Sequence, residues 1–389
     1  MDATGKENIK ALYLDPTLKN YKNFLLSKKL VKTKLKPDKS NICNYIPNKN
    51  NFDLIRVGLA LIVFLVHAAA LSGYSSLNLI INFFSAEIAV KSFFIISGFL
   101  IFMSYEKSKN ISLFFSKRIR RIYPAYFVVI VISTLSGLIY SSASLHEYIS
   151  FTTLKYLISN LLFLNFIQPN LPGLFVENSI KAVNGALWTL KIEVMFYILV
   201  PIIVMVFNRI GRLKAMIGIY IFSLLYSYTL LHFYEIYNLS FLLDLQRQLP
   251  GQLTYFIMGA LGYYFFECFK KYSVYLLGVA IFLMLFKQSL PWLIFEPGFL
   301  LIFILFFATK FYYLGNFNKY GDFSYGIYIL HFPVLQILIS YQIYKNFHWI
   351  FLIASSTIVI SLSFLLWHFI EKPFLKNTSH YTTKGNFGE

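Results

Sequence analysis

The chain has 389 residues, of which 57% are hydrophobic, 19% aromatic and only 13% charged. Soluble globular domains carry about 25% charged residues, so this chain has roughly half the charge that a water-facing surface needs. The net charge is +18, but in a chain this apolar an excess of lysine and arginine indicates the cytoplasmic loops of a membrane protein and not a nucleic-acid partner.

The first 50 residues are rich in lysine, with eleven lysines against four acidic residues, and they contain no apolar run. A cleaved signal peptide needs an apolar run after its basic start, so residues 1–50 are predicted to be a cytoplasmic extension. Such an extension either lies against anionic membrane lipid or stays solvated.

From residue 54 onward the chain contains apolar runs of about 20 residues, the length at which an α-helix crosses a membrane. Strict alternation of apolar and polar residues is missing, which argues against an outer-membrane barrel. The sequence therefore predicts an all-α, polytopic integral membrane protein, with residues 51–375 as its membrane domain and 376–389 as a cytoplasmic tail. About ten transmembrane helices are predicted, at 54–72, 83–103, 122–141, 186–207, 213–233, 250–269, 272–290, 291–309, 324–344 and 348–369.

Basic residues are distributed unevenly between the predicted loops. With the N-terminus inside, 27 lysines and arginines fall in inner segments and five in outer segments. The positive-inside rule then predicts that both termini are cytoplasmic. The longest outer segment, about 142–185, would cap the external face.

Arg56 and His67 lie eleven positions apart in the first span. Eleven helical positions advance about three turns plus 20° and rise roughly 16.5 Å, so both side chains share one face. Arg56 would lie near the cytoplasmic boundary and His67 near mid-membrane. A lone histidine on a helix is more often a packing residue, so this pair alone leaves its role open.

The second span begins with Glu87 and Lys91, whose i, i+4 spacing favours an internal ion pair. Arg118 and Arg121 precede the third span and share a helical face. Positive-inside topology explains these two arginines, but a pair of guanidinium groups at a membrane edge also suits a phosphate-bearing ligand. Gly98, together with Ser97, is typical of a close contact between helices.

The fourth span begins with Trp188 and Lys191, which are ordinary interfacial anchors, whereas Glu193 one turn further inside is harder to explain in that way. The ninth span carries Tyr328 and His331 on one stripe with Ser324, and either Ser324 or Asp322 can cap its start.

The order and spacing of these motifs resemble those of the acyltransferase-3 family of bacterial membrane acyltransferases, many of which O-acetylate lipopolysaccharide, capsule or other surface glycans. The resemblance covers about residues 51–375. It implies transfer of an acetyl or other acyl group from acyl-CoA, with acetyl-CoA as donor, to a hydroxyl of a lipid-linked or exported glycan at the bacterial inner membrane. It rests on Arg56 with His67, Arg118 with Arg121 before Tyr123-Pro124, and the segments AVKSFFIISGFLI, LWTLKIEVMFY, YGIYILHFP and IEKPF.

The resemblance also implies roles for single residues. Histidine titrates near neutral pH and is suited to deprotonating an alcohol, and the family makes His67 the catalytic residue. By the same resemblance Arg118 and Arg121 would hold the CoA phosphates. The catalytic set would also include Arg56 and Glu193, and the donor path would be lined by Lys91, Trp188, Tyr328 and His331.

No metal is implied, because the chain has only two cysteines and no histidine spacing of the HExxH type. Two other functions stay open at this stage. A secondary transporter or exporter of a surface glycan also uses buried ionisable residues, but inverted repeats and broken helices would be expected of it. A multi-pass glycan polymerase would not need a phosphate site at Arg118 and Arg121.

Overall fold

A computed structural model describes residues 47, 49–108, 110–315, 317 and 321–375. The chain divides into Met1–Pro47 and Asn48–Glu389, and every helix described below belongs to the second unit. All regular structure in the described residues is helical, which confirms the predicted all-α class. The predicted tail 376–389 and almost all of the lysine-rich extension 1–50 lie outside the described residues.

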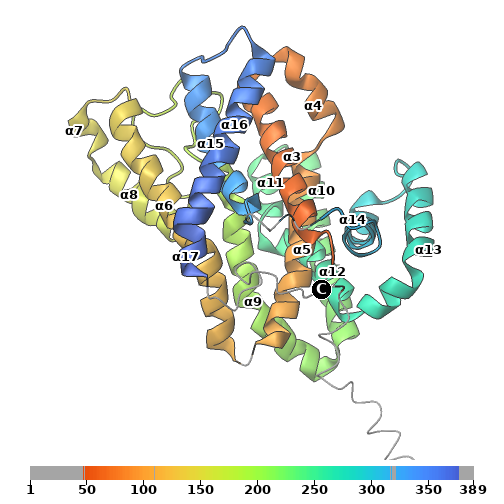
Figure 1. The fold of residues 1–389 in the computed structure, drawn as a ribbon. Helices are drawn as coiled ribbons and strands as arrows, with labels where there is room; N and C mark the ends of the chain where they lie inside the picture. Colours follow the sequence, from red (N-terminus) through yellow and green to blue (C-terminus); the bar gives the residue numbers. More distant parts are fainter. Residues whose placement is uncertain (1–46, 48, 109, 316, 318–320, 376–389) are drawn as a thin grey trace, which may run out of the picture. The chain divides into compact units, whose positions relative to one another are not determined.

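Each predicted span corresponds to one long helix, although several of the boundaries differ (Figure 1). Shorter elements join them: η2 (Ser75–Leu77), α4 (Asn78–Phe83), α7 (Leu145–Tyr148), α8 (Phe151–Leu161), η3 (Gly185–Leu187), α11 (Phe241–Gln246), η5 (Trp367–Glu371) and α17 (Lys372–Phe374). The long helices are α3 (Phe52–Ser72), α5 (Ala86–Lys107), α6 (Ile111–Tyr140), α9 (Trp188–Ile210), α10 (Arg212–Tyr237), α12 (Leu249–Tyr264), α13 (Phe266–Leu285), α14 (Trp292–Thr309), α15 (Ser324–Ser340) and α16 (His348–Leu366).

Eight helical segments of the described chain are long and apolar enough to cross a membrane. The remaining two predicted spans correspond to α12 and α15, which have 16 and 17 residues and are shorter than the predicted spans. Both are buried along most of their length, so they lie inside the bundle. The predicted boundary at 269–272 is wrong, because α13 already begins at Phe266. The residues of the turn between α12 and α13 are themselves apolar, so hydropathy does not reveal where one helix ends and the next begins.

Helix α5 packs against α3, α9, α12 and α14, and α15 packs against both α3 and α16 (Figure 1). Helix α6 begins eleven residues before the predicted span, because the basic stretch before Pro124 is itself helical. The segment predicted to cap the outer face forms α7 and α8 beside α6 and then lies along α15. There Asn178 donates hydrogen bonds to the side chain of Gln336, at 2.8 Å, and to its backbone carbonyl, at 3.0 Å.

Two glycines bring α5 and α12 into direct backbone contact. A Cβ atom on Gly98 would lie 2.1 Å from the carbonyl oxygen of Phe256, and one on Gly259 would lie 2.0 Å from that of Ile95. Small residues allow such close approach of helices within a membrane. The structure thus confirms Gly98 as a helix–helix contact, and it adds Gly259 as the opposing residue.

We expect Gly259→Ala to lower the stability of the protein by about 1–3 kcal/mol, because the methyl group would force α5 and α12 apart. Gly278→Ala is the matched control, since Gly278 is also helical but has no atom within 4 Å of an added Cβ. Thermal unfolding in detergent checks both variants. Equal midpoints for the two variants would contradict the proposed packing constraint.

Candidate active site

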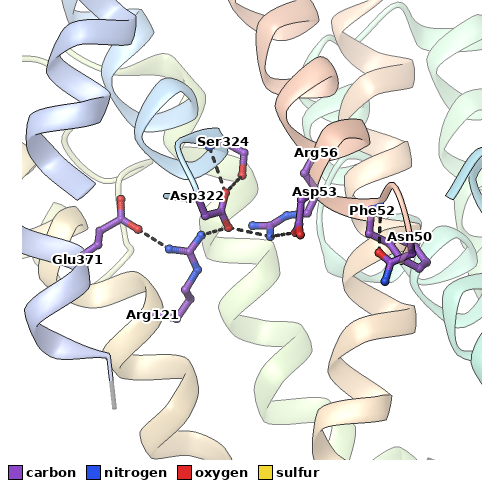
Figure 2. A network of polar contacts seen from close by, with 8 residues as sticks. All are labelled: Asn50, Phe52, Asp53, Arg56, Arg121, Asp322, Ser324 and Glu371. Carbon is purple, nitrogen blue, oxygen red and sulfur yellow. Dashed lines mark hydrogen bonds and ion pairs between the residues drawn. The ribbon is translucent and has the colours of Figure 1, made fainter. Parts of the chain in front are cut away.

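Four charged side chains form a buried ion network where α3, α6, α15 and η5 approach one another (Figure 2). The carboxylate of Asp322 lies 2.8 Å from Arg56 Nη1 and 2.6 Å from Arg121 Nη2. Arg121 also pairs with Glu371. Asp322 further accepts hydrogen bonds from the hydroxyl of Ser324, at 2.6 Å, and from its backbone N–H, at 3.2 Å. Asp322 therefore holds the start of α15 against α3 and α6.

The two carboxylates of the network are fully buried, with Asp322 2% and Glu371 1% exposed, whereas the side chains of Arg56 and Arg121 are 15% and 10% exposed. Burial opposes ionisation of the Asp322 carboxyl, but the neighbouring Arg56 and Arg121 outweigh it and lower its pKa. Asp322 therefore stays charged between the two arginines. Sequence reasoning identified it only as a helix cap and did not assign Glu371 a role, although both acids stand next to apolar spans.

Arg118 and Arg121 have different surroundings, although the sequence placed them on one helical face as a pair. Arg121 is occupied by two carboxylates, whereas Arg118 donates a hydrogen bond to the hydroxyl of Ser104 at 2.7 Å. The Arg118 guanidinium faces the ring of Tyr197 at 5.8 Å. Within the described residues its buried Nε has no hydrogen-bond partner. Of the two arginines, Arg118 is the one with bonding capacity left for an anion.

A cavity of about 650 Å³ lies between α3, α5, α6, α9 and α15. Lining residues of α5 run from Val90 to Lys107, which at 1.5 Å per residue corresponds to about 25 Å. The cavity is therefore long in the direction of α5, and its two ends can differ in chemistry.

One end of the cavity is strongly basic. It lies where α5 ends and α6 begins, and among the described lining residues Glu193 is the only acid. Glu193 accepts a hydrogen bond from the hydroxyl of Tyr197 at 2.6 Å. Arg56 also lines the cavity, and the basic end itself is formed by Lys107, Lys117, Arg118, Arg120 and Arg121.

The opposite end is apolar and aromatic, formed by Val90, Phe93, Thr189 and Tyr328. The hydroxyl of Thr189 lies 3.1 Å from the carbonyl oxygen of Ala186, which can only accept a hydrogen bond. Thr189 therefore donates to that carbonyl and accepts from the hydroxyl of Tyr328 at 2.6 Å. The Tyr328 ring is held in place at the end of the cavity.

His67 and His331 form a hydrogen-bonded pair next to Tyr328. His67 Nδ1 lies 2.8 Å from His331 Nε2, and the rings of His331 and Tyr328 contact edge to face at 5.8 Å. His331 Nδ1 lies 3.2 Å from the carbonyl oxygen of Ile327, which can only accept. When both rings are neutral, His331 thus carries its proton on Nδ1, and its Nε2 accepts from the Nδ1–H of His67. In this arrangement the Nε2 of His67 is unprotonated.

Lys91 and Trp188, which were also predicted as site residues, lie apart from the cavity and the histidine pair. Lys91 pairs with Glu87 at 2.6 Å, as its spacing predicted, and with Glu296 of α14 at 2.8 Å. Neither Lys91 nor Trp188 is among the residues that line the cavity, and His67 and His331 do not line it themselves but lie behind Tyr328. Glu296 was not recognised from the sequence, because a single acid in an apolar run does not reveal its partner on a distant helix.

The predicted stripe of the ninth span does converge on the cavity, since Ser324 and Tyr328 line it and His331 adjoins Tyr328. Among the described residues no group of three or more histidine, cysteine or acidic side chains could hold a metal ion.

The sequence model of a family described as "Acyltransferase domain" matches residues 49–368, which include the histidine pair, the ion network except Glu371, and every cavity-lining residue except Leu375. The chain belongs to the acyltransferase-3 family. It is therefore an acyltransferase of the multi-pass membrane type, as the resemblance implied.

Two relatives of this acyltransferase extend over most of its length. An O-acetyl transferase of Shigella phage Sf6 is 28% identical over 341 residues, which cover 85% of this chain and 97% of the phage protein. Nodulation protein 10 of Rhizobium leguminosarum bv. viciae is 27% identical over 356 residues, which cover 85% of this chain and 94% of that relative. No solved structure matches the chain.

We expect Asp322→Ala to destabilise this acyltransferase by about 3–5 kcal/mol, because it leaves Arg56 and Arg121 buried without their shared carboxylate. The control is Asp244→Ala, which removes a carboxylate 4.0 Å from Arg247 at the protein surface. An exposed pair contributes about 0–1 kcal/mol. Unfolding in detergent measures both, and similar losses for the two variants would show that the network does not hold the bundle.

Proposed function

We propose that this acyltransferase transfers an acetyl group from acetyl-CoA to a hydroxyl of a cell-surface or lipid-linked glycan at the bacterial inner membrane. The observation that carries the proposal is the cavity, which is basic at one end and adjoins a histidine pair at the other. An elongated donor with phosphates at one end and a thioester at the other suits this distribution of charge. The similarity to the O-acetyl transferase of the phage supports acetyl as the group transferred.

The basic end of the cavity would receive the phosphates of the donor. Arg118 is the principal ligand in this proposal, because its Nε has bonding capacity and no carboxylate among the described residues pairs with it. Lys107, Lys117 and Arg120 add positive charge around it. Arg121 lines the same end but is bound by Asp322 and Glu371, so we propose that it chiefly positions α6. Under the positive-inside rule this end faces the cytoplasm, where acyl-CoA is made available.

The thioester is already activated, so the enzyme chiefly needs to deprotonate the acceptor hydroxyl and stabilise a tetrahedral oxyanion. In our proposal His67 Nε2 takes the hydroxyl proton while the hydroxyl oxygen attacks the thioester carbonyl. The C–S bond then breaks, and the proton passes from His67 to the departing CoA thiolate. The ester product and free CoA account for all atoms.

His331 would act through His67 in this scheme. Its Nε2 accepts the Nδ1–H of His67, which fixes the tautomer that leaves His67 Nε2 free as a base. The same bond favours the imidazolium that forms when His67 takes a proton. Arg56 and Glu193 line the cavity and would orient the arm of the donor, while Lys91 and Trp188 would act only through neighbouring residues.

We expect His67→Gln to lower acetyl transfer by about 10²–10⁴-fold, since glutamine keeps volume and hydrogen bonding but cannot take up a proton. Acetyl-CoA binding should stay at the wild-type level, because a general base acts in the transition state. The measurement is acetylation of surface glycan by mass spectrometry in cells lacking the protein and complemented with each variant, normalised to folded protein.

The control for His67→Gln is His348→Gln, which changes a histidine that bonds Ser76 at 2.7 Å, stacks on Tyr74 and does not belong to the histidine pair. It should leave acetylation unchanged. If His67→Gln instead acetylates glycan at nearly the wild-type rate per folded molecule, His67 is a packing residue and not the base.

We expect Arg118→Ala to weaken acetyl-CoA binding by roughly 10–100-fold, because a hydrogen bond to a charged group contributes about 1.5–3 kcal/mol. Arg209→Ala is the matched control, since Arg209 lies at the end of α9 and does not line the cavity. Titration calorimetry of the purified proteins with acetyl-CoA compares them. Normal affinity in Arg118→Ala would mean that the basic cluster serves only to orient the chain in the membrane.

A further inference from the structure

Two aromatic rings line the end of the cavity opposite the basic residues. Phe93 of α5 and Tyr328 of α15 contact edge to face, with ring centroids 5.9 Å apart and an interplanar angle of 77°. Both line the cavity, and Val90 lies one turn before Phe93 on the same helix. Lys107, fourteen positions after Phe93, lines the basic end. Along α5 this separation corresponds to about 21 Å.

The two rings differ in how they are held. Tyr328 forms a hydrogen bond of 2.6 Å with Thr189 and packs against His331. These two contacts fix the position of its ring. Phe93 has no polar atom and is fixed by packing alone. The α5 backbone behind it is held close to α12 by the contact of Gly98 with Gly259. Phe93 is therefore a bulky side chain at the aromatic end of the cavity that a smaller residue could replace without removing a hydrogen bond.

We propose that Phe93 limits the acyl group of the donor to acetyl or a chain of similar length. The inference rests on the proposed function, because phosphates bound at the basic end direct the thioester toward the opposite end. The carbonyl would then lie near Tyr328 and the histidine pair. Carbon atoms beyond the carbonyl would enter the space beside Val90 and Phe93, where the Phe93 ring would limit the length of the chain.

The expected size of the effect follows from the physics of apolar pockets. One methylene too many or too few in such a pocket changes kcat/KM by about 10–200-fold. Removing the Phe93 ring should thus relax discrimination between acetyl and longer acyl groups, while the phosphate contacts at the other end of the cavity stay as they are.

The test compares kcat/KM for acetyl-, butyryl- and hexanoyl-CoA in the purified wild-type protein and in Phe93→Ala, with the same acceptor glycan. We expect the butyryl-to-acetyl ratio to rise by at least 10-fold in Phe93→Ala. Phe93→Leu, which removes less volume, should give a smaller rise and serves as the deciding variant if Phe93→Ala does not fold. Leu100→Ala is the position control, because Leu100 also lines the cavity but lies seven residues closer to the basic end.

Each outcome has a distinct meaning. A ratio that rises in the Phe93 variants and not in Leu100→Ala supports the inference. A wild-type protein that uses butyryl-CoA as well as acetyl-CoA, or Phe93 variants whose ratio stays within twofold of wild type, overturns it while leaving the proposed function intact. A folded wild-type protein that transfers no acyl group from any acyl-CoA overturns the proposed function, and this inference with it.

Discussion

The carboxylate of Asp322 lies between the guanidinium groups of Arg56 and Arg121, and the rest of the site depends on this contact. Buried charges are costly unless they are paired, so each arginine constrains the helix that carries it. Arg56 belongs to α3, which also carries His67, and Arg121 belongs to α6, which also carries Arg118. Through Asp322 the start of α15 is held against both helices. The network thus sets the spacing between the basic end of the cavity and the histidine pair.

The same network explains why two arginines three residues apart have different roles. Arg121 faces two buried carboxylates, and its charge is used in holding helices together. Arg118, less than one turn away, points to Ser104 and Tyr197 along the cavity and keeps a buried Nε without a partner in the described part of the chain. The sequence motif suggested that both arginines bind one ligand. In the structure Arg121 holds helices together, and Arg118 is available to an anion.

The packing of α5 determines how charged and apolar groups are distributed along the cavity. Because α5 approaches α12 through Gly98 and Gly259, its other face is directed at α9 and α15 and lines the cavity from Val90 to Lys107. Positive charge at one end and a histidine pair beyond the other would favour one orientation of the proposed donor. In the proposed function this orientation brings the thioester, and not the phosphates, toward His67.

Hydropathy alone determined the all-α membrane fold and the existence of each long helix, because the length and polarity of a span are local properties of the chain. Helical spacing likewise predicted the Glu87–Lys91 pair and the shared stripe of Ser324, Tyr328 and His331, which depend on one helix only. The partners of Arg121, Lys91 and His67 were decided by tertiary structure, since Glu371, Glu296 and His331 stand more than 200 residues away from them. A sequence pattern specifies which face of a helix carries a group, but only the packing of helices brings two such faces together.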